Sequence, residues 1–190
     1  MDIDIGIKTI TMSIETHNDA RAVFRKCGTC SQTFAHLLNR EFGQNDDHYE
    51  RALDPLAGGI LRKGHQCGML WGASLAVGAE ATHRTSSINE ARTLAITTTQ
   101  GVVDSFVRRT NTVNCKEITG VDQSTLLGLV KFMVKTLATG MDNSLCFNLA
   151  EAWAPEAIAA GKQGLQEKSY DHTDDMVNCA SLVAEGLGAT

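Results

Sequence analysis

The chain has 190 residues, 43% of them hydrophobic and 21% charged, and this length supports a core that needs neither a disulfide nor a metal to fold. The formal net charge is −5, and the lysines and arginines are scattered, so no basic stripe is present for a phosphate backbone and we expect no nucleic-acid partner. Only two prolines and long stretches rich in Ala, Leu, Met, Gln and Glu favour an all-α fold.

The first predicted element is an N-terminal arm. Residues 3–14 alternate apolar and polar side chains, which predicts a short strand or an extended arm over residues 1–16. The segment opens with acidic residues and has neither the positive region nor the apolar region of a secretory signal. The longest apolar run of the chain, residues 67–79, is shorter than the ~20 residues that span a bilayer. We therefore expect a soluble, cytoplasmic protein without membrane insertion.

A helical pattern begins near Asn18 and continues past a pair of cysteines. After the stretch KCGTC, apolar residues recur at helical spacing, which places Cys30 in the first turn of an amphipathic helix. These apolar residues are Phe34, Leu37, Leu38 and Phe42. A polar connection follows and ends at Pro55 and the pair Gly58–Gly59.

The most glycine-dense stretch is AGGILRKGHQCGMLWGASLAVGAEA, residues 57–81. Its interior glycines, Gly64, Gly68, Gly72 and Gly78, place small residues along one face of a predicted helix. Each interior glycine costs a helix about 1 kcal/mol relative to alanine, so several of them need a physical reason. We expect another backbone or an inorganic group to approach this stretch closely.

Three further helices are predicted toward the C-terminus. A capping box from Ser87 to Glu90 begins a helix that runs to about Arg109. A second helix covers residues 124–139, and a third covers residues 174–185 and holds Cys179. The second helix has a face of large apolar side chains that we expect to be buried: Leu126, Leu127, Val130, Met133, Val134 and Leu137.

No internal repeat, low-complexity tract or linker divides the chain. We therefore predict one all-α domain over residues 1–190, a helical bundle of about six helices. Within it, residues 1–16 form the arm, residues 17–166 the core and residues 167–190 a C-terminal helix extension.

The six cysteines carry the strongest chemical signal, because cytosolic thiols are kept reduced and then point to metal binding or catalysis. Cys30, Cys67 and Cys115 lie at or near helix ends or glycine-rich turns, where backbone N–H groups favour the thiolate. The long gaps between the cysteines match neither a zinc ribbon nor a compact ferredoxin. The residue pattern alone leaves open a cluster, a thiol relay, a zinc site or simply buried cysteines.

Cys27 and Cys30 form a C-x-x-C pair, which fits a redox dithiol, half of a metal site or a chance spacing. Ser31 stands where haem attachment requires a histidine, so we expect no haem. No βαβ pattern surrounds the pair, which disfavours a thioredoxin fold.

Four segments together resemble the C_GCAxxG_C_C family of redox-active proteins, named for its cysteine pattern. They are GTCSQTFAHLLN around Cys30, AGGILRKGHQCGMLWGASLAVG around Cys67, CKEITG at Cys115, and Cys146 followed by a helix with Pro155. The resemblance covers about residues 20–165. The chain departs from the family pattern at Met69, which replaces an alanine, and at Trp71, which replaces a small residue.

Proteins similar to this one include the non-haem part of split-Soret cytochromes, in which the cysteines are associated with an iron–sulfur centre. The resemblance therefore implies one iron–sulfur cluster, of the 2Fe–2S or 4Fe–4S type, in this chain. Its implied ligands are Cys30, Cys67, Cys115 and Cys146.

Residues near the implied ligands are candidates for contact with the cluster. Gly59, Gly68 and Gly72 are cofactor-binding candidates because cluster sulfides accept hydrogen bonds from nearby backbone N–H groups. His65, two residues before Cys67, is a further candidate as a hydrogen-bond donor, a replacement ligand or a proton carrier. A histidine in such a place more often caps or lines a turn.

The predicted function is that of an iron–sulfur redox protein that transfers electrons to or from a partner oxidoreductase. No nucleophile triad, P-loop or dinucleotide fingerprint is present, so an electron-transfer protein or redox subunit fits better than a stand-alone enzyme. The alternatives are a cluster-free thiol–disulfide protein that uses Cys27 and Cys30, or a structural subunit of a larger redox enzyme. The alternating arm and the small-residue helix surface also predict a homodimer.

Overall fold

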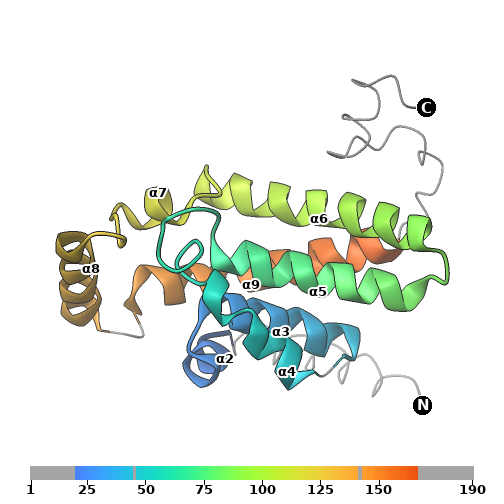
Figure 1. The fold of residues 1–190 in the computed structure, drawn as a ribbon, viewed down its shortest axis with the longest axis horizontal. Helices are drawn as coiled ribbons and strands as arrows, with labels where there is room; N and C mark the ends of the chain where they lie inside the picture. Colours follow the sequence, from blue (N-terminus) through green and yellow to red (C-terminus); the bar gives the residue numbers. More distant parts are fainter. Residues whose placement is uncertain (1–19, 45, 141–142, 167–190) are drawn as a thin grey trace, which may run out of the picture.

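The computed structural model describes residues 20–44, 46–140 and 143–166 and folds them into helices (Figure 1). The described part holds eight α-helices, so the prediction of about six was wrong. Two short helices that the apolar pattern did not separate, of six and five residues, account for the difference, because so few turns carry no hydrophobic periodicity. The elements are α2 (Ala20–Cys27), α3 (Cys30–Phe42), α4 (Asp47–Ala52), the 3₁₀ turn η1 (Asp54–Leu56), α5 (Gly68–Arg84), α6 (Ile88–Thr110), α7 (Cys115–Thr119), α8 (Leu126–Thr139) and α9 (Leu145–Gln166).

The all-α prediction is confirmed for the described residues, which contain no β-strand. One isolated backbone bridge pairs Gln66 with Asn114. The predicted arm over residues 1–16 and the predicted helix over residues 174–185 lie outside the described residues. None of the described helices combines the length and the apolar character needed to cross a lipid bilayer.

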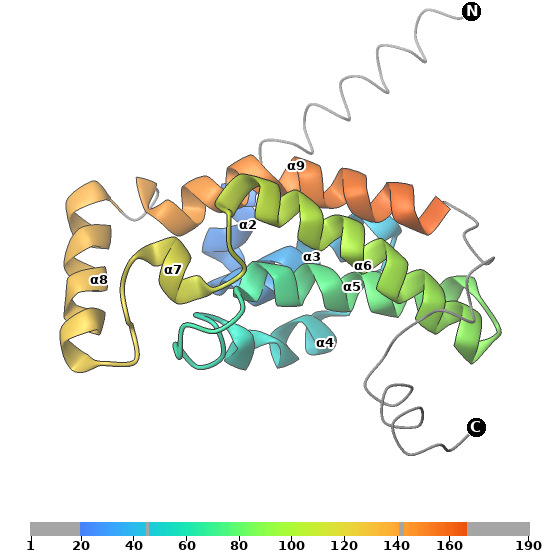
Figure 2. The same cartoon turned by 90° about the horizontal axis from the view of Figure 1, so that it is seen from above.

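The trunk of the molecule consists of four long helices, α3, α5, α6 and α9, which lie side by side (Figures 1 and 2). Its centre is Trp153 of α9, which is fully buried and stacks on Phe34 of α3 at 4.7 Å between ring centroids. Phe106 of α6 meets the same indole edge-on at 4.6 Å. The indole N–H donates to Ser105 Oγ at 3.0 Å, so the one polar atom of this side chain is satisfied without water.

Two of the interior glycines of α5 have opposite surroundings. A Cβ added at Gly72 would lie 2.1 Å from the Ser31 carbonyl oxygen, so this glycine lets α5 cross α3 in backbone contact. A Cβ added at Gly78 would meet nothing within 4 Å. The close approach expected from the glycine-rich stretch is therefore met at Gly72 by the backbone of α3.

Helix α8 stands at one end of the molecule, beyond the trunk, in both views (Figures 1 and 2). Thr125 caps it by accepting a hydrogen bond from the Gly128 N–H, as expected for a helix that starts at a threonine. Its large apolar side chains were predicted to be buried, and the structure corrects this. Gly128 is its one buried residue, and the predicted core face is turned to solvent.

Candidate functional site

All four family-pattern cysteines lie at the start of a helix. Cys30 and Cys115 are the first residues of α3 and α7, and Cys67 is the N-cap residue of α5. Cys146 is the second residue of α9. The sequence predicted that Cys30, Cys67 and Cys115 lie at or near helix ends or glycine-rich turns, and the structure places them, with Cys146, at helix starts. Because unpaired N–H groups give a helix start partial positive charge, each position favours the thiolate form.

Backbone hydrogen bonds bring two of these helix starts together. The Cys67 N–H donates to the Val113 carbonyl at 2.8 Å, and the Cys115 N–H donates to the His65 carbonyl at 2.7 Å. The Lys116 N–H extends the pairing to the Gly64 carbonyl at 3.0 Å. This short antiparallel contact holds Cys67 and Cys115 next to each other although 48 positions separate them in the chain.

The four cysteines line one cavity of about 310 Å³. Cys67 and Cys115 are buried, and Cys30 and Cys146 are partly buried. Apolar side chains complete the walls, among them Phe24, Met69, Phe132, Phe147 and Leu149. The structure thus brings together four sulfur atoms that the sequence spreads over 117 residues.

Backbone N–H groups point at the sulfur of Cys30. Donors come from Gly58, from Gly68, and from Cys30 and Ser31 at the start of α3. A Cβ added at Gly68 would lie 2.6 Å from Cys30 Sγ, so no side chain larger than glycine fits there without displacing the thiol. The Met69 N–H makes the same kind of bond to Cys67. N–H groups aimed at sulfur stabilise negative charge on it.

Despite these donors, burial dominates the acid strength of the free thiols. Loss of water raises the pKa of Cys30 above its ordinary value and that of Cys67 well above it. Burial raises the pKa of Cys115 to about 11 and that of Cys146 to about 12, and the charge of the neighbouring Cys30 acts in the same direction on both. In the metal-free protein at neutral pH the four groups are therefore protonated.

The loop that covers Cys30 has an uncommon backbone. Ile60, Leu61 and Arg62 all have left-handed φ values, of 61°, 51° and 64°, directly after two glycines in the same region. Left-handed backbone costs roughly 1–2 kcal/mol at a non-glycine residue. The turn aims the Gly58 N–H at Cys30 and places Arg62 on the cavity wall. The sequence marked Gly58 only as a turn residue and gave no local signal for Arg62, although the glycine pair before Ile60 favours left-handed backbone.

The remaining predicted contacts do not line the cavity. Gly59 lies in the turn, where an added Cβ would come within 2.4 Å of the His65 carbonyl oxygen. The His65 side chain is exposed, and the residue acts through its backbone, as the acceptor for Cys115. Gly72 sits at the crossing of α3 and α5. A direct role for these three residues at a cofactor stays a prediction.

Cys27 does not line the four-cysteine cavity, although the next residue, Gly28, does. Gly28, with a φ of 83°, ends α2 directly after Cys27, and α3 begins two residues later, so the C-x-x-C pair is divided between two helices. The Cys27 thiol bonds with the Thr33 side chain. Burial raises its pKa, and the nearby carboxylate of Glu50 raises it further.

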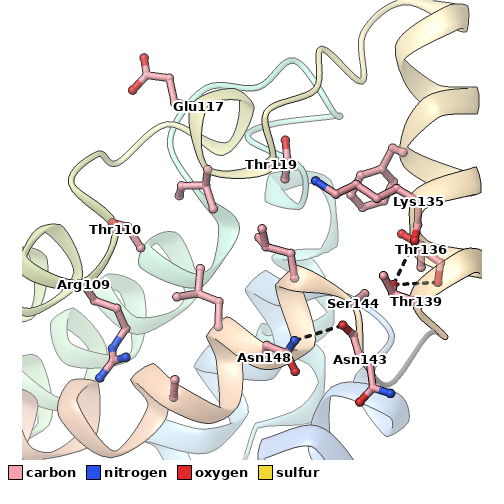
Figure 3. Close-up of a pocket in the computed structure, with 15 residues that line it drawn as sticks. Arg109, Thr110, Glu117, Thr119, Lys135, Thr136, Thr139, Asn143, Ser144 and Asn148 are labelled. Carbon is pink, nitrogen blue, oxygen red and sulfur yellow. Dashed lines mark hydrogen bonds between the residues drawn. The ribbon is translucent and has the colours of Figure 1, made fainter.

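A second, more polar cavity of about 570 Å³ adjoins the first, between α6, α7, α8 and α9. Figure 3 shows the Lys135 ammonium group extended toward Thr119 across this space. The two cavities share six wall residues: Ile118, Thr119, Phe132, Thr136, Ser144 and Leu149. No local motif in the sequence marks this cavity, because its lining comes from four helices.

No three His, Cys, Asp or Glu side chains among the described residues are arranged to hold a single metal ion.

A family model described as "Putative redox-active protein (C_GCAxxG_C_C)" matches residues 28–189, which confirms the resemblance inferred from the sequence. No curated protein matches the chain significantly, and neither does any solved structure.

Proposed function

Because the chain belongs to the C_GCAxxG_C_C family of redox-active proteins, we propose that it is an iron–sulfur protein exchanging electrons with a partner oxidoreductase. One observation carries the proposal: four cysteines from the starts of four helices line one cavity of about 310 Å³. The proposed ligands are Cys30, Cys67, Cys115 and Cys146.

The lining residues suit an anionic group held by thiolates. Four thiolates in one cavity repel one another strongly, and bound iron offsets their charge. The N–H groups of Gly58 and Gly68 stabilise negative charge at Cys30, while Phe24 and Phe147 keep water from the apolar wall. A cluster bound there would supply one-electron chemistry, with a potential set by these hydrogen bonds and by burial.

The high pKa values do not oppose ligation, because a metal displaces the thiol proton when it binds. They do weaken the alternative of a thiol–disulfide relay through Cys27 and Cys30. Attack on a disulfide requires a thiolate, and burial raises the pKa of both thiols. The two cysteines also lie on separate helices, and Cys27 bonds to Thr33 instead of lining the shared cavity.

Anaerobic purification with iron and sulfide analysis tests the proposal. We expect the wild-type protein to contain iron and acid-labile sulfide and to show broad visible absorption that bleaches on reduction. Cys30→Ser, Cys67→Ser, Cys115→Ser and Cys146→Ser should each lose most of the iron. The control Cys27→Ser should retain iron and colour.

Two outcomes would contradict the proposal. The first is a wild-type protein that takes up no iron or sulfide during anaerobic reconstitution. The second is full iron retention in the double variant Cys27→Ser with Cys30→Ser, which removes the nearby thiol that could replace Cys30 and would exclude Cys30 as a ligand.

A further inference from the structure

We propose that two copies of this chain form a two-fold dimer through the outward face of α8. This α8 face consists of six large apolar side chains, from 49% to 80% exposed: Leu126, Leu127, Val130, Met133, Val134 and Leu137. The inference rests on packing alone and does not depend on the proposed cluster.

The apolar and inward faces of α8 are on opposite sides of the helix. Gly128, Phe132 and Thr136, four residues apart, face the body of the protein, and the last two line both cavities. The exposed residues follow spacings of three and four, as in the run Leu127, Val130, Val134 and Leu137. Such a stripe packs side by side with the same stripe of a second helix.

The rest of the described chain does little to hold α8 in place. Its single buried residue is Gly128, which has no side chain to contribute to a core. Isolated helices of about 14 residues are marginal in water, and helices in proteins are stabilised mainly by burial of an apolar face. A partner on the α8 face supplies the burial that the single chain lacks.

The size of the face fits a stable dimer. Six side chains of this size at the observed exposures present on the order of 700 Å² of apolar surface, close to the ~800 Å² per partner of a standard interface. The interfaces of weak electron-transfer complexes bury less surface than this standard size, whereas homodimer interfaces have a larger apolar fraction. The six positions of the stripe are all apolar, and the two lysines of α8, Lys131 and Lys135, lie to one side of it. This composition favours a homodimer over a transient redox partner.

The position of α8 also favours a second copy. It stands beyond the end of the trunk in both views (Figures 1 and 2). Because Phe132 and Thr136 face the body of the protein, the α8 face on the opposite side is open to a second copy. Two-fold dimers, in which the same patch serves both subunits, are the commonest assemblies of identical chains.

Light scattering of the full-length protein gives the first test. We expect a mass near twice the 20.4 kDa of one chain for the wild type and near 20.4 kDa for the double variant Leu127→Glu with Leu137→Glu. Ile88→Glu is the matched control, because Ile88 is 74% exposed on α6, and it should remain dimeric. A monomeric wild type, or a folded double variant that stays dimeric, would overturn the proposal.

Photo-crosslinking tests the interface without disrupting it. With the photoreactive residue p-benzoylphenylalanine in place of Val134, the dimer model predicts an inter-chain product whose crosslinked peptide lies within residues 126–139 of the second copy. Mixing isotope-labelled and unlabelled chains distinguishes this product from an intrachain one. A crosslink to residues 1–19 or 167–190 of the same chain would show that another segment covers the face. The absence of an inter-chain crosslink to α8 would overturn the dimer. This measurement decides the question even if the glutamate variant does not fold.

Discussion

The two ends of the helix bundle are built on different principles. In the trunk, α3, α5, α6 and α9 close around Trp153, and large side chains are fully buried. The end where α3, α5 and α9 begin is built instead with the short helix α7, a left-handed turn and the exposed apolar face of α8. The trunk provides the stability that allows the cysteine end to hold two buried thiols, two partly buried thiols and a strained loop. Substitutions in the two regions should therefore act on different properties.

The largest effect is expected in the trunk, from Trp153→Ala. Removal of a fully buried indole that packs on Phe34 and Phe106 should lower the free energy of unfolding by about 3–5 kcal/mol. Chemical denaturation followed by circular dichroism measures this loss. Val107→Ala is the control, because Val107 is partly exposed and should cost under ~1 kcal/mol. A comparable loss in both variants would remove the distinction between trunk and surface.

The second prediction concerns the thiols of the metal-free protein at high pH. Burial raises the pKa of the Cys115 thiol from 9.0 to about 11 in the folded state, so this pKa lies above that of the unfolded state. The folded state holds the proton of Cys115 more tightly than the unfolded state does. The protonated thiol therefore contributes fully to the free energy of unfolding below pH 9, and this contribution is lost as the pH rises toward 11. For a buried group, a pKa difference of this size lowers the free energy of unfolding by about 3 kcal/mol over this pH range.

Denaturant titrations of chelator-treated protein across this pH range test the prediction. Cys115→Ala should weaken the pH dependence, because it removes one of the buried thiols that titrate at high pH. Metal-loaded protein should not show this decline, since ligating thiols are already deprotonated. An unchanged pH profile in the metal-free Cys115→Ala variant would contradict the assignment.

A third prediction compares two glycines of the same helix. Gly72→Ala places a Cβ against the Ser31 carbonyl oxygen, at 2.1 Å, and should destabilise the crossing of α3 and α5 by about 1–3 kcal/mol. Gly78→Ala meets nothing within 4 Å and should stabilise the helix by up to about 1 kcal/mol. Thermal unfolding of the pair gives the comparison. Equal and small effects would mean that α5 and α3 are not in backbone contact at Gly72.

The smallest effect is expected at the strained turn, from Leu61→Gly. Leu61 is 66% exposed and left-handed, so glycine relieves a steric cost of roughly 1–2 kcal/mol. About half of this gain is lost because glycine adds freedom to the unfolded chain. We expect a net stabilisation below ~1 kcal/mol by denaturant titration. Lys63→Gly, outside the left-handed residues, is the control and should not stabilise. Stabilisation by the control alone would contradict the strain argument.

Local signals in the sequence were sufficient for the starts of α3 and α6. The capping box at Ser87 begins α6, with the Ser87 side chain accepting from the Glu90 N–H. Cys30 lies in the first turn of α3, as its apolar spacing predicted. Capping and periodicity depend on residues within one or two turns, so the sequence alone carries them.

The convergence of the cysteines and the exposure of α8 were decided by tertiary structure. Periodicity identifies an apolar face but not what covers it. The sequence therefore predicted that the apolar side chains of α8 are buried, although α8 stands beyond the trunk and they are exposed. Likewise, Gly68 and Gly72 belong to one small-residue pattern, but one lies against Cys30 Sγ and the other against the α3 backbone. The direction in which each helix leaves its loop is set by long-range packing, such as the pairing of Cys115 with His65. Those non-local contacts bring four distant thiols to one cavity.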